Sequence, residues 1–320
     1  GDCLAVAPVA EELKKFLILF DCGTPRIFED ASYKYVFRTA AHATQDNVAL
    51  GRYMKARNVK VGTLSMINQD YAWGQDSRAD FVATMAQLFP EAKVESDLLP
   101  KFGAGQYGTE VSALARAGSD VVYSSLWGGD LQAFILQAGP RGLFQRSQGV
   151  LSAADHVLQP LGDKMPNGVI IGARGAYGLM SPKTPLNEWF FDGYKAERGG
   201  VYPVQASYRM VQALLGLKTA VEKAMATNGG KKPSPEELAA ALENAEWESP
   251  GGKIQMKLGN GHQAIQPMAI GRTRFDADKK MVVIEDIQNF EAECVNPPAN
   301  MKSIEWIKAG FPGAKCDGGS

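Results

Sequence analysis

The sequence lacks long apolar runs and has almost no excess charge. The longest apolar stretch in its 320 residues is far shorter than the roughly 18 residues needed to cross a membrane. Thirty-four basic and thirty-five acidic residues leave a net charge of −1, so neither a nucleic-acid surface nor a basic membrane face is expected. The apolar content of 45% is ordinary for a packed core. At about 100–200 residues per domain, the length predicts two domains.

Catalytic and metal-binding motifs are also scarce. The three histidines, His42, His156 and His262, are scattered and none has a second ligand at metal spacing. No G-x-S-x-G, H-E-x-x-H or Walker A motif occurs. Residues 103–108 match G-x-G-x-x-G, but the next predicted strand ends in Trp127 and not in the acid that would hold a ribose. These patterns predict no cofactor and no enzyme activity, with an NAD-dependent enzyme using the Gly103 loop as a remote alternative.

Cysteine is rare, and its four positions admit two interpretations. Cys3, Cys22, Cys294 and Cys316 lie near the ends of the chain, without C-x-x-C spacing. They are either four reduced thiols of a cytosolic protein or two disulfides formed in an oxidising compartment. In the second case Cys3 and Cys22 would lie at one edge of a βα unit, where a Cα separation of about 5–6 Å is reachable. Cys294 would then pair with Cys316. The residues alone leave both interpretations open.

Helical and extended patterns alternate through the first 174 residues. The continuous apolar run at 16–20 is typical of a strand buried on both faces of a parallel sheet. Thr44 is the expected N-cap of a helix that reaches about residue 58. Further strands are expected at 36–39, 61–67, 94–99, 121–126, 150–153 and 169–171, with helices at 4–15, 75–88, 109–117 and from 131 to 138. This rhythm predicts an α/β fold with doubly wound parallel sheets.

The pattern changes after residue 174. Helices are expected at 186–197 and 203–225, and a capping box starts a further helix at Ser234. Strands are expected at 254–257, 265–273 and 282–287, followed by an irregular tail from Val295. A single sheet would not normally accommodate this many units. We therefore predict two α/β lobes, with the chain crossing between them more than once.

The ends of the predicted parallel strands carry the candidate binding residues. In open α/β sheets, ligands bind beyond these ends, where loops meet helix N-termini. Gly23 offers an unhindered amide and Thr24 a hydroxyl, both suited to a carboxylate, while Trp73 and Trp127 would supply apolar walls. An acid at Asp130 or Asp155 could accept from an ammonium or hydroxyl group, or could equally cap a helix. Together they predict a binding cleft without a reactive centre.

Several short segments together resemble one protein family. They are LAVAPVAEE (4–12), GTPRIF (23–28), VFRTA (36–40), DYAWGQ (70–75), AGSDVVYSSLWGGD (117–130) and GHQAIQPMAIG (261–271). In this order they resemble the solute-binding proteins of ABC importers of the leucine/isoleucine/valine type. The resemblance implies a type I periplasmic binding protein, with two lobes joined by three hinge strands. It implies residues 1–41 plus 175–273 as one lobe and 42–174 plus 274–320 as the other.

The resemblance also implies a function and a location. A monomeric receptor in the periplasm, its signal peptide removed, would bind an amino acid or small carboxylate between the lobes and deliver it to a membrane permease of the ABC type. Export would favour the two disulfides. A cytoplasmic amide- or ligand-sensing regulator of the same fold is the alternative. The family's chains begin about 70–80 residues earlier, or roughly two βα units, so we expect the first lobe to lack its N-terminal part.

The resemblance assigns roles to individual residues. The turn formed by Asp21, Cys22, Gly23 and Thr24 would hold the ligand's carboxylate. Trp73 and Trp127 lie where the family has aromatic side chains, often tyrosine, that close over the ligand. Asp155 lies near the acid that meets the amino group of amino acids, and Tyr202 lies near the remaining cleft contact. Tryptophan in place of tyrosine adds area and removes hydroxyl groups, so we expect a ligand larger or more aromatic than leucine.

Overall fold

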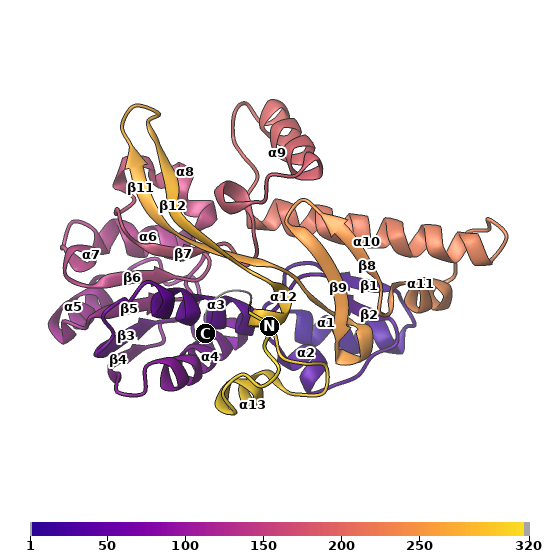
Figure 1. Cartoon of the computed structure of the whole chain (residues 1–320), viewed down its shortest axis with the longest axis horizontal. Helices are drawn as coiled ribbons and strands as arrows, with labels where there is room; N and C mark the ends of the chain where they lie inside the picture. The colour runs from indigo at the N-terminus through magenta and orange to yellow at the C-terminus, as the bar shows by residue number, and fades with distance from the viewer. Residues whose placement is uncertain (1, 317–320) are drawn as a thin grey trace.

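Two β-sheets, each covered by helices, lie side by side in the computed structural model, which describes residues 2–316 (Figure 1). We call the lobe built on the five-stranded sheet the first lobe and that built on the seven-stranded sheet the second lobe. The five-stranded sheet runs β1 (Leu17–Leu19), β2 (Val36–Arg38), β10 (Gln263–Ile265), β9 (Gly252–Leu258), β8 (Glu246–Ser249). The seven-stranded sheet runs β12 (Met281–Phe290), β11 (Met268–Asp276), β7 (Ile170–Gly172), β6 (Gln148–Leu151), β5 (Val121–Ser124), β3 (Thr63–Ile67), β4 (Lys93–Leu98).

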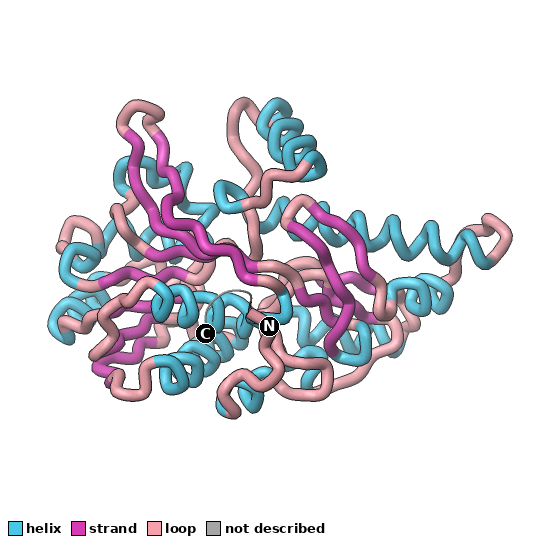
Figure 2. Tube along the Cα trace, viewed as in Figure 1, coloured by secondary structure: helices cyan, strands magenta, loops and turns pink. Residues whose placement is uncertain are grey.

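The predicted α/β class with two lobes is confirmed. Strands β4, β3, β5, β6 and β7 pair in parallel, as do β1, β2 and β10. The remaining strands are antiparallel, because β8–β9 and β11–β12 are hairpins (Figure 2). The chain passes between the sheets after β2, between β7 and β8, and between β10 and β11.

Helices cover both faces of the sheets. The first lobe carries α1 (Asp2–Glu12), α2 (Arg26–Glu29), α10 (Gln205–Thr227) and α11 (Pro235–Leu242). The second lobe carries α3 (Ala43–Ala56), α4 (Ala72–Leu88), α5 (Gly108–Ala117), α6 (Gly128–Ala138), α7 (Leu143–Arg146), α8 (Leu158–Leu161), α12 (Ala292–Val295) and α13 (Ser303–Lys308), and α9 (Pro185–Glu197) packs on its core through Phe190. Short 3₁₀ turns lie at Asp155–Val157, Gly162–Lys164, Gly178–Met180 and Gly259–Gly261.

Alternate residues of the central strands pack into opposite cores. In β5, Val121 and Tyr123 belong to the core beneath α3 and α4, whereas Val122 belongs to the core beneath α5 and α6. In β2, Val36 and Phe37 likewise separate into two cores. This alternation follows from the period of two in a strand and explains why successive residues of these strands are apolar.

The structure corrects three details of the prediction. The chain re-enters the second lobe after β10 and not at residue 273, because Gln266-Pro267 interrupts the expected single strand and proline cannot donate to a ladder. The N-cap of α3 is His42; the Thr44 hydroxyl instead donates to Asp80 Oδ2 at 2.6 Å. The tail from Val295 is not wholly irregular, since α13 packs Trp306 into the second lobe.

The four cysteines form the two predicted pairs. The Cα atoms of Cys3 and Cys22 lie 6.4 Å apart and those of Cys294 and Cys316 lie 4.7 Å apart, both as disulfides. The first joins α1 to the turn after β1. The second ties the C-terminal segment to α12. In the part of the chain that the structure describes, no helix has both the length and the apolar character needed to span a bilayer.

Candidate ligand-binding site

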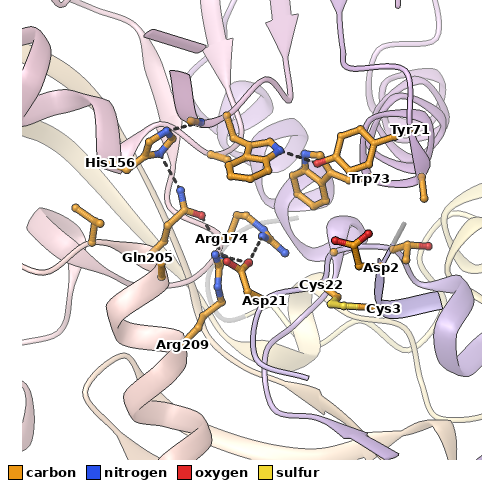
Figure 3. A pocket seen from close by; sticks show the side chains of 18 residues that line it. Asp2, Cys3, Asp21, Cys22, Tyr71, Trp73, His156, Arg174, Gln205 and Arg209 are labelled. Carbon is orange, nitrogen blue, oxygen red and sulfur yellow. Dashed lines mark hydrogen bonds and ion pairs between the residues drawn. A yellow bond between two sulfur atoms is a disulfide. The ribbon is translucent and has the colours of Figure 1, made fainter. Parts of the chain in front are cut away.

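A cavity of about 390 Å³ lies between the two lobes (Figure 3). Six of the eight predicted binding residues line it: Asp21, Cys22, Gly23, Thr24, Trp73 and Trp127. The other lining residues are Asp2, Cys3, Tyr71, Ala72, Gly128, Ala153, His156, Arg174, Val204, Gln205, Ala206 and Arg209. The ends of strands β1, β3, β5 and β6 therefore converge on one space. The sequence predicted this, because the candidate residues lie in the turns that follow the strands.

Two buried arginines dominate the charge of the cavity. Arg174 follows β7 and Arg209 lies in the first turns of α10; both reach the carboxylate of Asp21, at 3.0 and 2.6 Å. Burial disfavours a charged Asp21, but the guanidinium groups of Arg209 and Arg174 outweigh it and hold its pKa below 3.8. Arg174 Nη2 and Arg209 Nε are buried without a hydrogen-bond partner among the described residues. One acid is thus shared by two cations, which keep buried donors without a partner among the described residues.

A second carboxyl near the arginines, that of Asp46, is only partly ionised near neutral pH. Asp46, in α3, lies 3.7 Å from Arg174 Nε and is only 2% exposed. Burial raises its pKa to about 7 despite the neighbouring arginine. Asp46 is therefore partly protonated near neutral pH, and the positive charge of Arg174 is not fully offset.

Backbone donors add to this positive character. Neither the N–H of Gly23 nor that of Thr24 donates to another residue in the range 2–316. Helices α4, α6 and α10 all begin at the cavity wall, with N-caps Tyr71, Trp127 and Val204. The positive ends of three helix dipoles therefore point toward the same space, which favours an anion there.

Trp73 forms a wall of the cavity and also a contact between the lobes. Its Nε1 donates to the carbonyl of Ser125 at 3.0 Å, and the Arg174 guanidinium lies 4.3 Å from its ring centroid. The ring packs so closely on Gly23 that a Cβ there would overlap it. Glycine at position 23 is therefore required for the first-lobe turn to meet the second-lobe tryptophan.

Trp127 also lines the cavity, beside Tyr71. Its Nε1 donates to the Tyr71 hydroxyl at 2.6 Å, and 42% of the residue is exposed. Burial raises the pKa of Tyr71 to about 12, so its hydroxyl stays protonated. The two tryptophans and Tyr71 together give the cavity an aromatic wall.

Asp155 and Tyr202 are not brought to the cavity. Asp155 is buried and its Oδ2 accepts from the Gln205 backbone N–H at 2.6 Å, so it caps the start of α10. Tyr202 is buried and stacks on Phe191, with ring centroids 5.9 Å apart. Of the two interpretations of Asp155, a ligand contact or a helix cap, the structure shows the cap.

The prediction did not include His156, Arg174, Gln205 or Arg209. His156 Nε2 accepts from the Gly128 N–H at 2.7 Å, and its Nδ1 lies 3.0 Å from the Gln205 amide nitrogen. One sequence signal for α10 was present: Gln205, Arg209 and Gln212 recur at helical spacing on the face that is buried. Polar residues on the buried face of a helix indicate a polar site beneath it.

The arrangement can bind an anion with an apolar body. It holds buried arginine donors and an aromatic surface. Among the described residues, no three His, Cys, Asp or Glu side chains cluster in a way that would hold a metal ion.

Two α/β lobes that enclose a ligand-sized cavity at their strand ends define the class of bilobal solute-binding proteins. The chain belongs to the periplasmic binding protein family, whose sequence profile matches residues 1–280. No curated protein matches the sequence.

Solved structures of the same fold come from several bacteria. A solute-binding protein of an ABC transporter from Rhodopseudomonas palustris BisB5, in complex with 3,4-dihydroxybenzoic acid, is 22% identical, with a TM-score of 0.76 over 93% of this chain and 78% of that chain. Another from Rhodopseudomonas palustris, in complex with 4-hydroxybenzoate, is 20% identical (TM-score 0.75, 91% and 76%). A leucine-, isoleucine-, valine-, threonine- and alanine-binding protein from Brucella ovis is 21% identical (TM-score 0.73, 90% and 73%).

Proposed function

We propose that the protein is the extracytoplasmic receptor of an ABC importer and that it binds aromatic carboxylates between its lobes. The observation that carries the proposal is one cavity lined by two buried arginines, by Gly23 and Thr24, whose amides have no partner among residues 2–316, and by the Trp73 ring. Charge-assisted hydrogen bonds from such donors suit a carboxylate. The aromatic wall suits a ring. The benzoate complexes of two similar structures support this ligand class.

An amino acid is a weaker candidate for the same cavity. The structural similarity to the Brucella ovis amino-acid-binding protein supports an amino acid as the ligand. An amino group needs an acceptor, however. Asp155 lies outside the cavity lining, where it caps α10, and Asp21 already meets two arginines. The remaining acid in the lining, Asp2, is exposed to solvent, which screens its charge. The cavity therefore favours an acid that carries no amino group.

The receptor role follows from binding between lobes. A ligand that contacts both lobes binds the closed arrangement more tightly than the open one, so binding shifts the population toward closure. The closed receptor would then present both lobes to a membrane permease, its partner. The two disulfides favour an oxidising compartment, the periplasm, over the cytoplasmic regulator. We expect the receptor to act as a monomer.

Calorimetric titration with a matched pair of ligands tests the proposal. We expect the protein to bind 4-hydroxybenzoate, to bind 4-hydroxybenzamide at least tenfold more weakly, and to bind leucine more weakly than the acid. The variant Arg174→Gln should weaken 4-hydroxybenzoate binding by roughly 10- to 150-fold, since a hydrogen bond to a charged group contributes about 1.5–3 kcal/mol. Arg116→Gln, an exposed arginine of α5, is the control. Equal affinity for acid and amide would refute the anion site.

A further inference from the structure

Three aromatic side chains of the second lobe form a cluster at the mouth of the cavity. The ring centroid of Phe102 lies 5.4 Å from that of Tyr71 and 5.8 Å from that of Trp127. Tyr71 and Trp127 line the cavity, while Phe102 lies beyond its lining. Phe102 is 58% exposed, although burial of such a ring would be favourable. An apolar surface therefore continues from the cavity wall toward solvent.

The glycine-rich segment 103–108 holds Phe102 in this place. Gly103 and Gly105 adopt positive φ angles of 75° and 64°, which only glycine takes readily. Their N–H groups donate to the carboxylate of Asp130, at 2.7 and 3.2 Å, and the Gln69 amide donates to it at 2.6 Å. Since these amides already donate to Asp130, they are not available to bind a phosphate group.

Asp130 connects the loop to the residue that Phe102 contacts. It is the third residue of α6, whose N-cap is Trp127. One carboxylate thus fixes the loop that carries Phe102 to the helix start that carries Trp127. Its hydrogen bonds from Gln69 and from the loop amides outweigh burial and hold its pKa below 3.8, so it stays charged in this role.

The cavity is larger than a benzoate needs. At about 30 Å³ per water molecule, 390 Å³ corresponds to roughly 13 waters, more than the non-hydrogen atoms of a single-ring aromatic acid. A benzoate held by Arg174 and Arg209 would therefore leave space on the side of Trp127.

We propose that Phe102 and Trp127, supported by Tyr71, form a distal aromatic subsite for the second ring of an extended aromatic carboxylate. The proposal rests on the proposed function for the direction of the ligand, with its anionic end at Arg174 and Arg209. The second ring would lie against Trp127 and displace solvent from Phe102. Offset or edge contacts between aromatic rings contribute about 0.5–1.5 kcal/mol beyond their buried area.

Two probes of different length test the subsite by calorimetry. Biphenyl-4-carboxylate should bind more tightly than benzoate to the unaltered protein. Phe102→Ala should weaken biphenyl-4-carboxylate binding by about 2- to 12-fold and leave benzoate binding within about twofold. Asp130→Asn, which weakens the anchor of the loop, should likewise weaken biphenyl-4-carboxylate binding and leave benzoate binding within about twofold. Leu136→Ala, at an exposed apolar residue of α6 outside the aromatic cluster, is the matched control and should change neither.

The outcomes separate the subsite from the proposed function. If Phe102→Ala weakens both probes equally, or neither, the subsite is overturned while the anion site stands. Preference of the unaltered protein for benzoate over biphenyl-4-carboxylate would also overturn the subsite. If the unaltered protein binds neither probe, the proposed function itself fails.

Discussion

Replacing Gly23 with alanine would place a methyl group between the two lobes. A Cβ at this position would overlap ring atoms of Trp73 and lie 2.9 Å from Arg174 Nη2. Gly23 belongs to the first lobe and Trp73 to the second, so the overlap is relieved when the lobes separate, without unfolding either one. Overpacking of this kind costs about 1–3 kcal/mol. Because ligand binding requires the closed arrangement, the Kd for 4-hydroxybenzoate should rise by roughly 5- to 150-fold.

The assay pairs calorimetric titration with small-angle scattering. Gly23→Ala should show the weaker Kd and a larger radius of gyration with ligand present, while its free energy of unfolding stays within about 1 kcal/mol of the unaltered protein. Gly193→Ala in α9 is the control, because a Cβ there would meet no atom within 4 Å and alanine favours the helix. An unchanged Kd in Gly23→Ala, or an equal loss in Gly193→Ala, would refute the role of this contact.

Three further predictions concern stability and closure. Burial raises the pKa of Asp80 from 3.8 to about 8, so the folded state holds the proton more tightly than the unfolded state. The free energy of unfolding should therefore fall as pH rises between these values, by at most about 1.4 kcal/mol per pH unit. Urea unfolding of Asp80→Asn should show a flatter dependence of this free energy on pH, and an unchanged slope would contradict the prediction. Replacing Cys3 and Cys22 with serine should lower the free energy of unfolding by about 2–4 kcal/mol, and an unchanged urea midpoint would argue against a structural disulfide. Arg26, in the first lobe, pairs with Asp76 of α4 at 2.8 Å. Because this pair is partly exposed, Arg26→Gln should weaken ligand binding by no more than about fivefold. A much larger loss of affinity by calorimetry would show that Arg26 does more than pair with Asp76.

Local patterns predicted much of the fold because they record burial. The alternating cores of β5 follow from a strand buried on both faces. The run at 16–20 instead forms the edge strand β1, whose side chains pack toward two cores but are mostly half-buried. The break between β10 and β11 at Gln266-Pro267 was missed because apolar residues lie directly before and after it. Helix α13 was missed because six residues carry too little periodicity, and it is stabilised by the packing of Trp306.

The candidate site was predictable only where it follows parallel strands. Strand β1 is followed by the turn Asp21–Thr24, β3 by Trp73 and β5 by Trp127. The geometry of parallel sheets brings the ends of these strands together. Arg174 follows β7 in a positive-φ conformation of 57°, which no local pattern indicated. Its contact with Asp21 joins the second lobe to the first, so it depends on how the lobes are placed, and Arg209 reaches the same acid from α10 of the first lobe.

The central claim is that the two lobes grip a carboxylate between Arg174, Arg209 and the Gly23–Thr24 amides. A crystal structure of the protein grown with 4-hydroxybenzoate tests it most directly. We predict ligand density in the cavity, with the carboxylate within hydrogen-bond distance of at least one arginine and one of these amides and the ring against Trp73. An empty cavity at saturating ligand, or a ligand whose carboxylate points away from both arginines, would contradict the account.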